Sequence, residues 1–280
     1  MPLIHTAEVG ETRMNRLERA LGDLTELDEL AGRSSPIHAL HPAAKLVATL
    51  AYIAFTLSFD KYDLTGLVPM LLWPALLFQI SGVGMKTCFH KLRFVLPLVM
   101  AVGLFNPFFD RSVALRLGGL SITGGVISML TLMLKGVLCL CATFLLIATT
   151  PIDRLCAALR QLHMPKLLVT LLLLTYRYAG VMTRELAIMT DAYHLRAPGQ
   201  RGIHISAWGS FLGQLLLRSM DRAQELYASM LLRGYDQQFH YAALGPFGAR
   251  DALYGIASIA AFALLRFVPV TRLLGDVLVR

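Results

Sequence analysis

Residues 122–150 read ITGGVISMLTLMLKGVLCLCATFLLIATT, and this stretch decides the class of fold. Its one charged residue is Lys135, so the run is long and apolar enough to cross a bilayer with length to spare for tilt. The whole chain agrees, since its 280 residues are 56% hydrophobic and 16% charged, with a mean hydropathy of +0.59. A typical soluble domain is about 45–50% apolar and about 25% charged. The composition therefore argues against a soluble enzyme, a disordered chain or a disulfide-rich secreted module.

Further apolar runs on both sides of this stretch predict a multispan protein. Each is close to the minimum of about 17 residues that a spanning helix needs. We therefore expect an all-α polytopic membrane protein with about five transmembrane helices and a cytoplasmic region of long amphipathic helices. The predicted organisation is an N-terminal segment 1–42, four spans within 43–150 (43–59, 64–80, 94–109 and 122–150), a cytoplasmic region 151–250, and a C-terminal span and tail 251–280.

The distribution of basic residues sets the expected orientation. The loop 81–93 contains Lys86, Lys91 and Arg93 and no acid, whereas the turn 60–63 contains a single lysine. The positive-inside rule then places 81–93 and 151–250 in the cytoplasm, together with the N-terminus. The C-terminus falls outside although it carries several arginines. The net charge of +8 is spread over loops and helices, which favours membrane lipids over nucleic acid as the partner.

The region 151–250 is predicted to be helical but not mainly membrane-spanning. A short amphipathic helix covers 153–163, a long helix runs from Pro165 to Arg196, and a second long helix runs from Ser206 to Arg233. The stretch 167–183 is ambiguous because Arg177 is its only charge, so it could also be a span. Its continuation is amphipathic, which favours a helix at the interface or packed on other helices.

No pattern in the sequence predicts a catalytic or metal site. Phosphate-loop, HExxH and GxSxG motifs are missing from the sequence, and the histidines are scattered. His38 and His41 could share a helical face, but no acid or thiol completes a site, so both are interpreted as surface or capping residues. Lys135 is interpreted as structural rather than as part of an ion path. The four cysteines are expected to be buried thiols without disulfides: Cys88, Cys139, Cys141 and Cys156.

The ends of the two long helices suggest a docking surface. Gly234 is suited to end the second helix in a left-handed conformation, with Arg233 in the last turn. A guanidinium there can bind a carboxylate of another protein through two hydrogen bonds. Arg196 ends the first helix in a similar way. The alternative is that both are ordinary C-terminal helix cations. The predicted contact face lies on one side of the second helix and consists of Ala223, Leu226, Tyr227 and Met230.

Several of these segments together resemble a known family. They are IHALHPAAKL at 37–46, AALRQLHMP at 157–165, LLLLTYRY at 171–178, RSMDRAQE at 218–225 and RGYD at 233–236. In this order and spacing, over about 36–240, the chain resembles the transmembrane T component of energy-coupling factor (ECF) transporters, in particular the CbiQ branch associated with cobalt uptake. The resemblance implies a non-catalytic subunit in a bacterial inner membrane.

The resemblance also implies partners and roles. In that family, two coupling helices end in a small residue–Arg–Gly motif whose arginines contact ABC-type ATPase subunits. Arg233 with Gly234 would carry the second motif and Arg196 the first, although Ala197 stands where a glycine is expected and leucines replace the small residues. ATP and Mg would be bound by the ATPases, and the substrate by a CbiM-like membrane subunit. This chain would need no cofactor of its own.

Three alternatives remain on sequence alone. The cargo could be nickel or a vitamin instead of cobalt. The chain could be a self-contained secondary transporter, which would need polar groups converging in mid-membrane. It could also be an integral membrane enzyme, whose candidate acids are better explained as solvated or paired helix residues: Asp153, Glu185, Asp191, Asp221, Glu225 and Asp236.

Overall fold

The chain is described by a computed structural model at residues 22, 30–32, 35–93, 95–109, 113–117, 120–197, 200, 202–236, 245 and 247–267. It divides into two compact units. The bundle unit comprises Leu30–Ala158 and Leu244–Arg280, and the long-helix unit comprises Met1–Glu29 and Leu159–Ala243. Most of the predicted N-terminal segment 1–42, and the tail after residue 267, lie outside the described residues.

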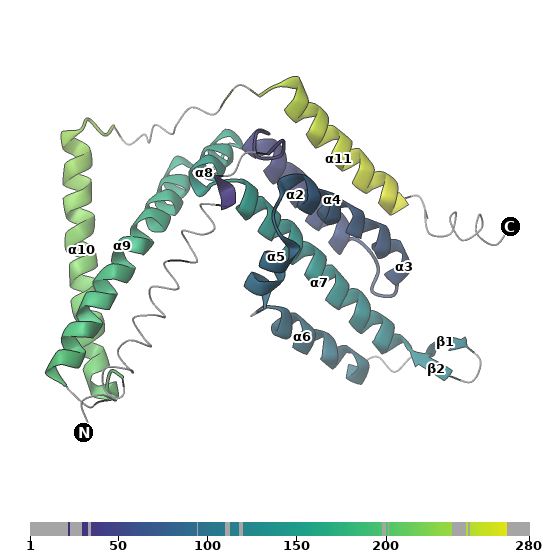
Figure 1. Cartoon of the computed structure of the whole chain (residues 1–280), viewed down its shortest axis with the longest axis horizontal. Helices are drawn as coiled ribbons and strands as arrows, with labels where there is room; N and C mark the ends of the chain where they lie inside the picture. Colours follow the sequence, from purple (N-terminus) through teal and green to yellow (C-terminus); the bar gives the residue numbers. More distant parts are fainter. Residues whose placement is uncertain are drawn as a thin grey trace. The chain divides into compact units, whose positions relative to one another are not determined.

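The bundle unit begins with α2, Pro42–Leu57 (Figure 1). Pro42 occupies the first turn, where a missing N–H costs nothing, and the His41 ring accepts a hydrogen bond from the Ala43 amide as the N-cap. The second predicted span is one continuous helical stretch built from α3 (Leu64–Leu67), the 3-10 turn η1 (Val68–Leu71) and α4 (Leu72–Ser81). It ends at Gly82, whose φ of 68° is a left-handed conformation that glycine adopts without strain.

Next in the bundle come α5 (Met85–Leu92), α6 (Leu96–Phe109) and the longest apolar helix, α7 (Gly124–Thr149). A short antiparallel hairpin, β1 (Val113–Leu117) with β2 (Leu120–Thr123), lies between α6 and α7. Glycines let α6 and α7 pack closely, because a Cβ on Gly136 would lie 2.5 Å from Val99 Cγ1. The predicted class, a helical polytopic membrane protein, is confirmed, with this hairpin as its β element.

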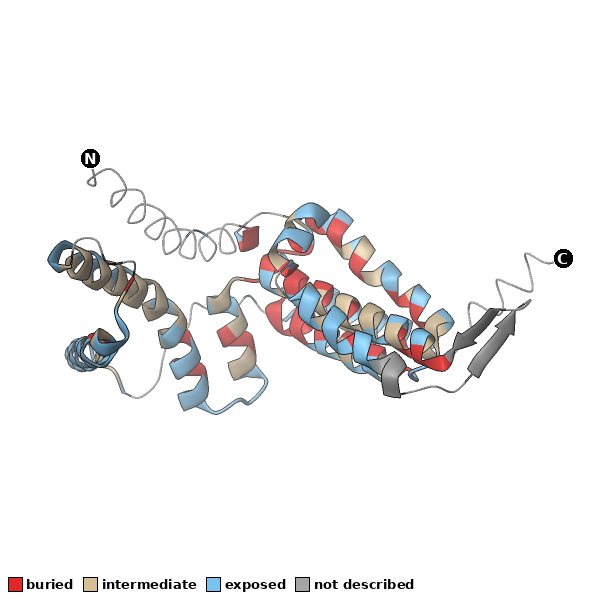
Figure 2. Cartoon of the chain, turned by 90° about the horizontal axis from the view of Figure 1, so that it is seen from below, coloured by how far each residue is buried: buried red, intermediate tan, exposed pale blue. Residues whose placement is uncertain are grey.

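The core of the bundle joins α2, the α3–α4 stretch, α7 and α11 (Ala249–Phe267). Tyr52 is its centre, stacked on Trp73 with ring centroids 4.5 Å apart and edge-on to Phe262 at 5.2 Å. The Tyr52 hydroxyl donates to the Met70 carbonyl at 2.9 Å, so its polar atom is paired inside the apolar core. In Figure 2 most of the red, buried stretches fall on the helices of this bundle. The core residues are Tyr52, Phe59, Leu67, Met70, Leu138, Ala142 and Phe262.

The predicted spans differ in how well they meet the requirements of a membrane. Among the described residues, two helical stretches are long and apolar enough to cross alone, Leu64–Ser81 and Gly124–Thr149. A third is possible if α5 and α6, which are bent by 65°, form one broken span. The first predicted span corresponds to the shorter apolar helix α2, and the last to α11, whose ends carry charges.

The long-helix unit matches its predicted helices closely. After α8 (Ile152–Gln161) at the boundary of the two units, α9 runs from Lys166 to Arg196 without a break. The 3-10 turn η2 (Ile205–Ala207) leads into α10, Trp208–Leu232. The stretch 167–183 lies within α9, which is not among the helices found long and apolar enough to span. In Figure 2 most of α9 and α10 is coloured exposed or intermediate, in contrast to the bundle.

Candidate functional site

The end of α10 has the geometry that the sequence predicts. Gly234 adopts φ +80°, the Gly234 amide donates to the Leu231 carbonyl at 3.0 Å, and the Tyr235 amide donates to the Met230 carbonyl at 3.0 Å. This pair of bonds is a Schellman motif, which satisfies carbonyls that a helix end leaves free. Arg233 and its neighbour Leu232 are both exposed at this end. The guanidinium is therefore presented on a rigid helix terminus.

The end of α9 is built differently. Ala197 stops the helix with φ −126° and ψ 64°, and its amide donates to the Tyr193 carbonyl at 3.0 Å. The Tyr193 hydroxyl then donates to Gln200 Oε1 at 2.9 Å and accepts from the His204 amide at 3.2 Å. One phenol thus ties both ends of the connection to the last turn of α9. Arg196 is exposed beside it, without the glycine cap that follows Arg233.

A charged pair joins α9 to α10. Arg218 of α10 donates to Glu185 of α9 and forms an ion pair with it, which we call the clasp. Beside it, Arg222 and Glu225 form a second ion pair along α10, with 3.5 Å between Nη1 and Oε2. These side chains line an open groove of about 290 Å³ together with Asp221 and the α9 residues Val181 and Met182. The sequence interpretation of these acids as paired helix residues is confirmed for Glu185 and Glu225.

One side of α10 carries exposed apolar side chains along its length. Of the predicted contact face, Ala223 and Tyr227 are exposed, and Leu226 and Met230 are half-buried. The same side extends toward the start of the helix at spacings of three and four residues. Because Phe211 is the single residue of α10 that is buried, this face is left without a cover within the described chain. Its most exposed large members are Trp208, Leu212, Leu216, Met220, Tyr227 and Leu231.

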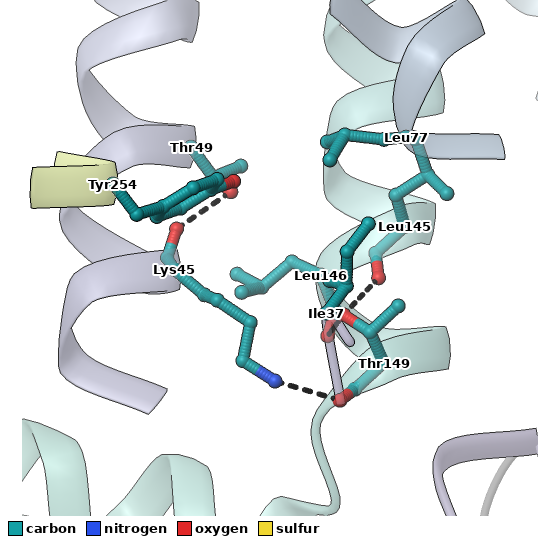
Figure 3. Close-up of a pocket in the computed structure, with 8 residues that line it drawn as sticks. All are labelled: Ile37, Lys45, Thr49, Leu77, Leu145, Leu146, Thr149 and Tyr254. Carbon is teal, nitrogen blue, oxygen red and sulfur yellow. Dashed lines mark hydrogen bonds between the residues drawn. The ribbon is translucent and has the colours of Figure 1, made fainter. Parts of the chain in front are cut away.

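In the bundle unit, Lys45 links two helix ends. Its ammonium donates to the Thr149 carbonyl at 2.8 Å, although the residue is 3% exposed (Figure 3). The cavity beside it has a volume of about 10 Å³, room for about one water molecule, so it cannot hold a substrate. Lys45 lies within the segment 37–46 that resembles the family, and the sequence pattern alone assigns it no role. A lysine in the first turn of an otherwise apolar helix is the signal that could have indicated one.

Asp251 ties the start of α11 to the start of α2. It accepts from the His41 amide at 2.7 Å and from the Gly248 amide at 2.9 Å. These two backbone donors hold the pKa of the Asp251 carboxyl below its ordinary value, because they stabilise the charged form. Asp251 stands in the first turn of α11, so the carboxylate lies at the end of this helix and outside its apolar middle. His41 is a capping residue here, as the sequence predicts.

Lys135 has structural partners, as the sequence predicts. It donates to the Phe59 carbonyl and, at 3.3 Å, to the Leu57 carbonyl. From α11, Arg266 donates to the Ser58 carbonyl at 3.0 Å. Two cations from neighbouring helices therefore neutralise the negative end of α2, which favours positive charge.

No metal cage appears among the described residues. No group of three or more His, Cys, Asp or Glu side chains comes together there. All four cysteines are free thiols, of which Cys88, Cys141 and Cys156 are buried and Cys139 is partly buried. The prediction of buried free thiols is confirmed for Cys88, Cys141 and Cys156, whereas Cys139 is only partly buried.

The described helices define a polytopic helical membrane protein with an exposed pair of long helices. The model of the CbiQ family, described as cobalt transport protein, matches residues 33–241. The match covers most of the chain, so the chain belongs to the CbiQ family of cobalt transport proteins. It is accordingly a membrane component of a transport family rather than a member of an enzyme family.

Individual relatives agree with this family. The chain is similar to nickel permease LarQ of Lactiplantibacillus plantarum, 33% identical over 91 residues, covering 32% of this chain and 33% of LarQ. It is 31% identical over 104 residues to cobalt transport protein CbiQ of Rhodobacter capsulatus, covering 36% of this chain and 42% of that protein. A fused cobalt transport protein, CbiMQ of Methanocorpusculum labreanum, is 28% identical over 98 residues, covering 35% of this chain and 16% of the fusion. The chain thus spans less than half the length of each of these three relatives.

Proposed function

We propose that this chain is the transmembrane coupling (T) subunit of an ECF-type ATP-driven importer. The observation that carries the proposal is the pair of exposed arginine ends on two long helices. Arg233 stands at a glycine-capped terminus and Arg196 at the end of the preceding helix. Membership of the CbiQ family supports the same role.

In this mechanism, ATP and Mg are bound by a partner pair of ABC-type ATPases. Arg196 and Arg233 anchor the helix ends in those subunits, and the apolar face of α10 covers part of the contact. Closure of the ATPases on ATP moves both ends. Because the clasp between Glu185 and Arg218 joins α9 to α10, the two helices respond together. In this proposal the chain passes a movement of the ATPases on to the membrane partner, so it performs no chemical step and needs no cofactor.

The second partner is a membrane subunit that binds the substrate, similar to CbiM. The relative described as a fused CbiMQ supports this pairing, because fusion keeps two chains side by side. The apolar surface of α6 offers a contact within the bilayer, since Leu98, Leu104 and Phe105 are strongly exposed. The bundle of this chain would then rock that subunit between the two sides of the membrane.

We propose cobalt as the cargo, with nickel as the alternative. The family description and the Rhodobacter relative favour cobalt, whereas the similarity to a nickel permease favours nickel. Selection between the two ions belongs to the substrate-binding partner in this proposal. We propose a location in the bacterial inner membrane, with the N-terminus and 151–250 in the cytoplasm. The acid-free loop 81–93 supports this orientation through the positive-inside rule.

The decisive experiment is affinity purification of the tagged full chain from its own membranes in a mild detergent. The expected result is copurification of two classes of protein, ATPases with nucleotide-binding motifs and a second membrane protein. When the complex is reconstituted into vesicles, it should transport cobalt or nickel only if ATP is present on the side of the membrane that carries the ATPases. Uptake by the chain alone, without ATPases, would instead identify a secondary transporter.

A further inference from the structure

The short helix α5 is packed into the bundle on one side only. Cys88 and Leu92 are its buried residues, and they lie four apart on the same side of the helix. Cys88 Sγ lies 3.9 Å from Cys141 Sγ of α7, which fixes the rotation of α5 about its axis. Lys86 and His90 lie on the opposite side of the helix and therefore face away from the bundle.

Between the buried side and this basic side, α5 carries a partly exposed apolar strip. Met85 is 50% exposed and Phe89 is 46% exposed, and they lie four residues apart. Lys86 and His90, also four apart, are exposed and occupy the adjoining strip. Exposed large apolar side chains beside basic ones are typical of a helix at the membrane interface, where the first enter the acyl boundary and the second reach the headgroups.

The position of α5 fits such a surface. Its axis is bent by 65° from that of α6, the apolar helix that follows it. Where α6 is the membrane-embedded part of this bent pair, α5 is inclined toward the membrane plane. The surrounding run 81–93 contains no acid and includes Lys86, Lys91 and Arg93. The local field therefore favours an anion at the depth of the headgroups.

We propose that α5 is an anionic-phospholipid binding surface. Lys86, with His90 beside it, binds the phosphodiester of a lipid such as phosphatidylglycerol, while Met85 and Phe89 insert among its acyl chains. The surface holds the bend between α5 and α6 at the interface. This assignment does not depend on what the protein transports or on how it is coupled to ATPases.

Native mass spectrometry of the purified full chain tests the assignment. The protein is released from mixed micelles holding equal amounts of phosphatidylglycerol and phosphatidylcholine, and the lipids retained are counted. Preferential retention of phosphatidylglycerol is expected. Lys86→Glu should reduce that preference about fivefold or more, because one cation near an anionic surface contributes about that factor. Lys86→Arg keeps the charge and should retain the preference.

The matched control is Arg184→Glu, a charge reversal at an exposed residue of α9. It should leave the lipid preference unchanged, and circular dichroism should show the same helix content for all variants. Inorganic phosphate is the second probe. If phosphate alone raises the melting temperature of the wild type as much as phosphatidylglycerol does, the ligand is a soluble anion and the lipid assignment is wrong. Equal retention of phosphatidylglycerol by Lys86→Glu and wild type would also overturn it.

Discussion

Lys45 Nζ donates to the Thr149 backbone oxygen at 2.8 Å, and this bond joins the first turn of α2 to the last residue of α7. A helix C-terminus carries partial negative charge, so an ammonium is favourable there. The carbonyl lies where the longest apolar helix ends and the chain turns toward α8 at Pro151. The bond therefore ties the C-terminal end of α7 to the start of α2 within the bundle.

Replacing Lys45 with methionine should lower the stability of the bundle. Methionine fills a similar volume but leaves the buried Thr149 carbonyl without its donor, which costs about 1–3 kcal/mol. Thermal unfolding in detergent measures the loss. Lys166→Met is the control, because Lys166 is exposed at the start of α9. A melting temperature unchanged by Lys45→Met would show that the bond contributes nothing.

Arg233→Glu should abolish most ATP-driven uptake while the protein stays in the membrane at its normal level. The change removes a charge-assisted contact and adds repulsion, so a loss of about tenfold or more is expected. Arg233→Ala should be milder, and a double substitution with Arg196 should cost more than either alone. Uptake of radioactive cobalt or nickel measures the effect, with Arg184→Glu as the control. Normal uptake and ATPase binding by Arg233→Glu would refute the anchor role.

If the clasp holds α9 and α10 together, two charge reversals that each reduce uptake should restore it when combined. Glu185→Arg and Arg218→Glu each place like charges between α9 and α10, and the double variant restores an opposite pair in swapped order. Because the pair is partly exposed, each single variant should change the free energy of unfolding by about 1 kcal/mol or less. Each single variant should lose much of its ATP-driven uptake although its stability changes little. The double variant should regain uptake.

Asp191→Arg is the control for the clasp, since it reverses another exposed charge on α9. Its uptake should match wild type. If the double variant is as defective as the worse single variant, the ion pair does not set the relation between the helices.

Gly136→Ala should separate α6 from α7. The added Cβ would lie 2.5 Å from Val99 Cγ1, so one helix must shift, at a cost of about 1–3 kcal/mol. Thermal unfolding should show the loss, and adding Val99→Ala should restore part of it. Gly255→Ala in α11 is the control, because nothing lies within 4 Å of its added Cβ. Equal melting temperatures for both alanine variants would contradict the close packing.

Local chemistry predicts the long helices and their ends well. The length and apolar composition of the runs 64–80 and 122–150 predict spanning helices. Gly234 predicts a left-handed helix cap, because few other residues tolerate that conformation. The Glu185–Arg218 pair could not be predicted in this way. Its members lie 33 positions apart, so only the packing of α9 on α10 brings them together.

The same limit applies within the bundle. His41 and Asp251 are 210 positions apart, and their hydrogen bond depends on how the last helix returns to the first. In the structure, the helices of the first and last predicted spans are also not long or apolar enough to be counted as membrane-crossing. The helix of the first span covers 16 residues, and α11 carries Asp251 and Arg266 near its ends. Apolar composition predicts that a segment is buried in protein or in lipid. It does not predict how many helices are each long enough to cross the membrane alone.

The apolar face of α10, which no described residue covers, has a consequence for the cell. An extended greasy strip is what chaperones and quality-control proteases recognise in an orphan subunit. If a partner subunit covers α10, as proposed above, copies synthesised in excess of that partner would be degraded, and the supply of the partner would then set the abundance of this protein. Stoichiometry would then be enforced after synthesis, by turnover of the surplus.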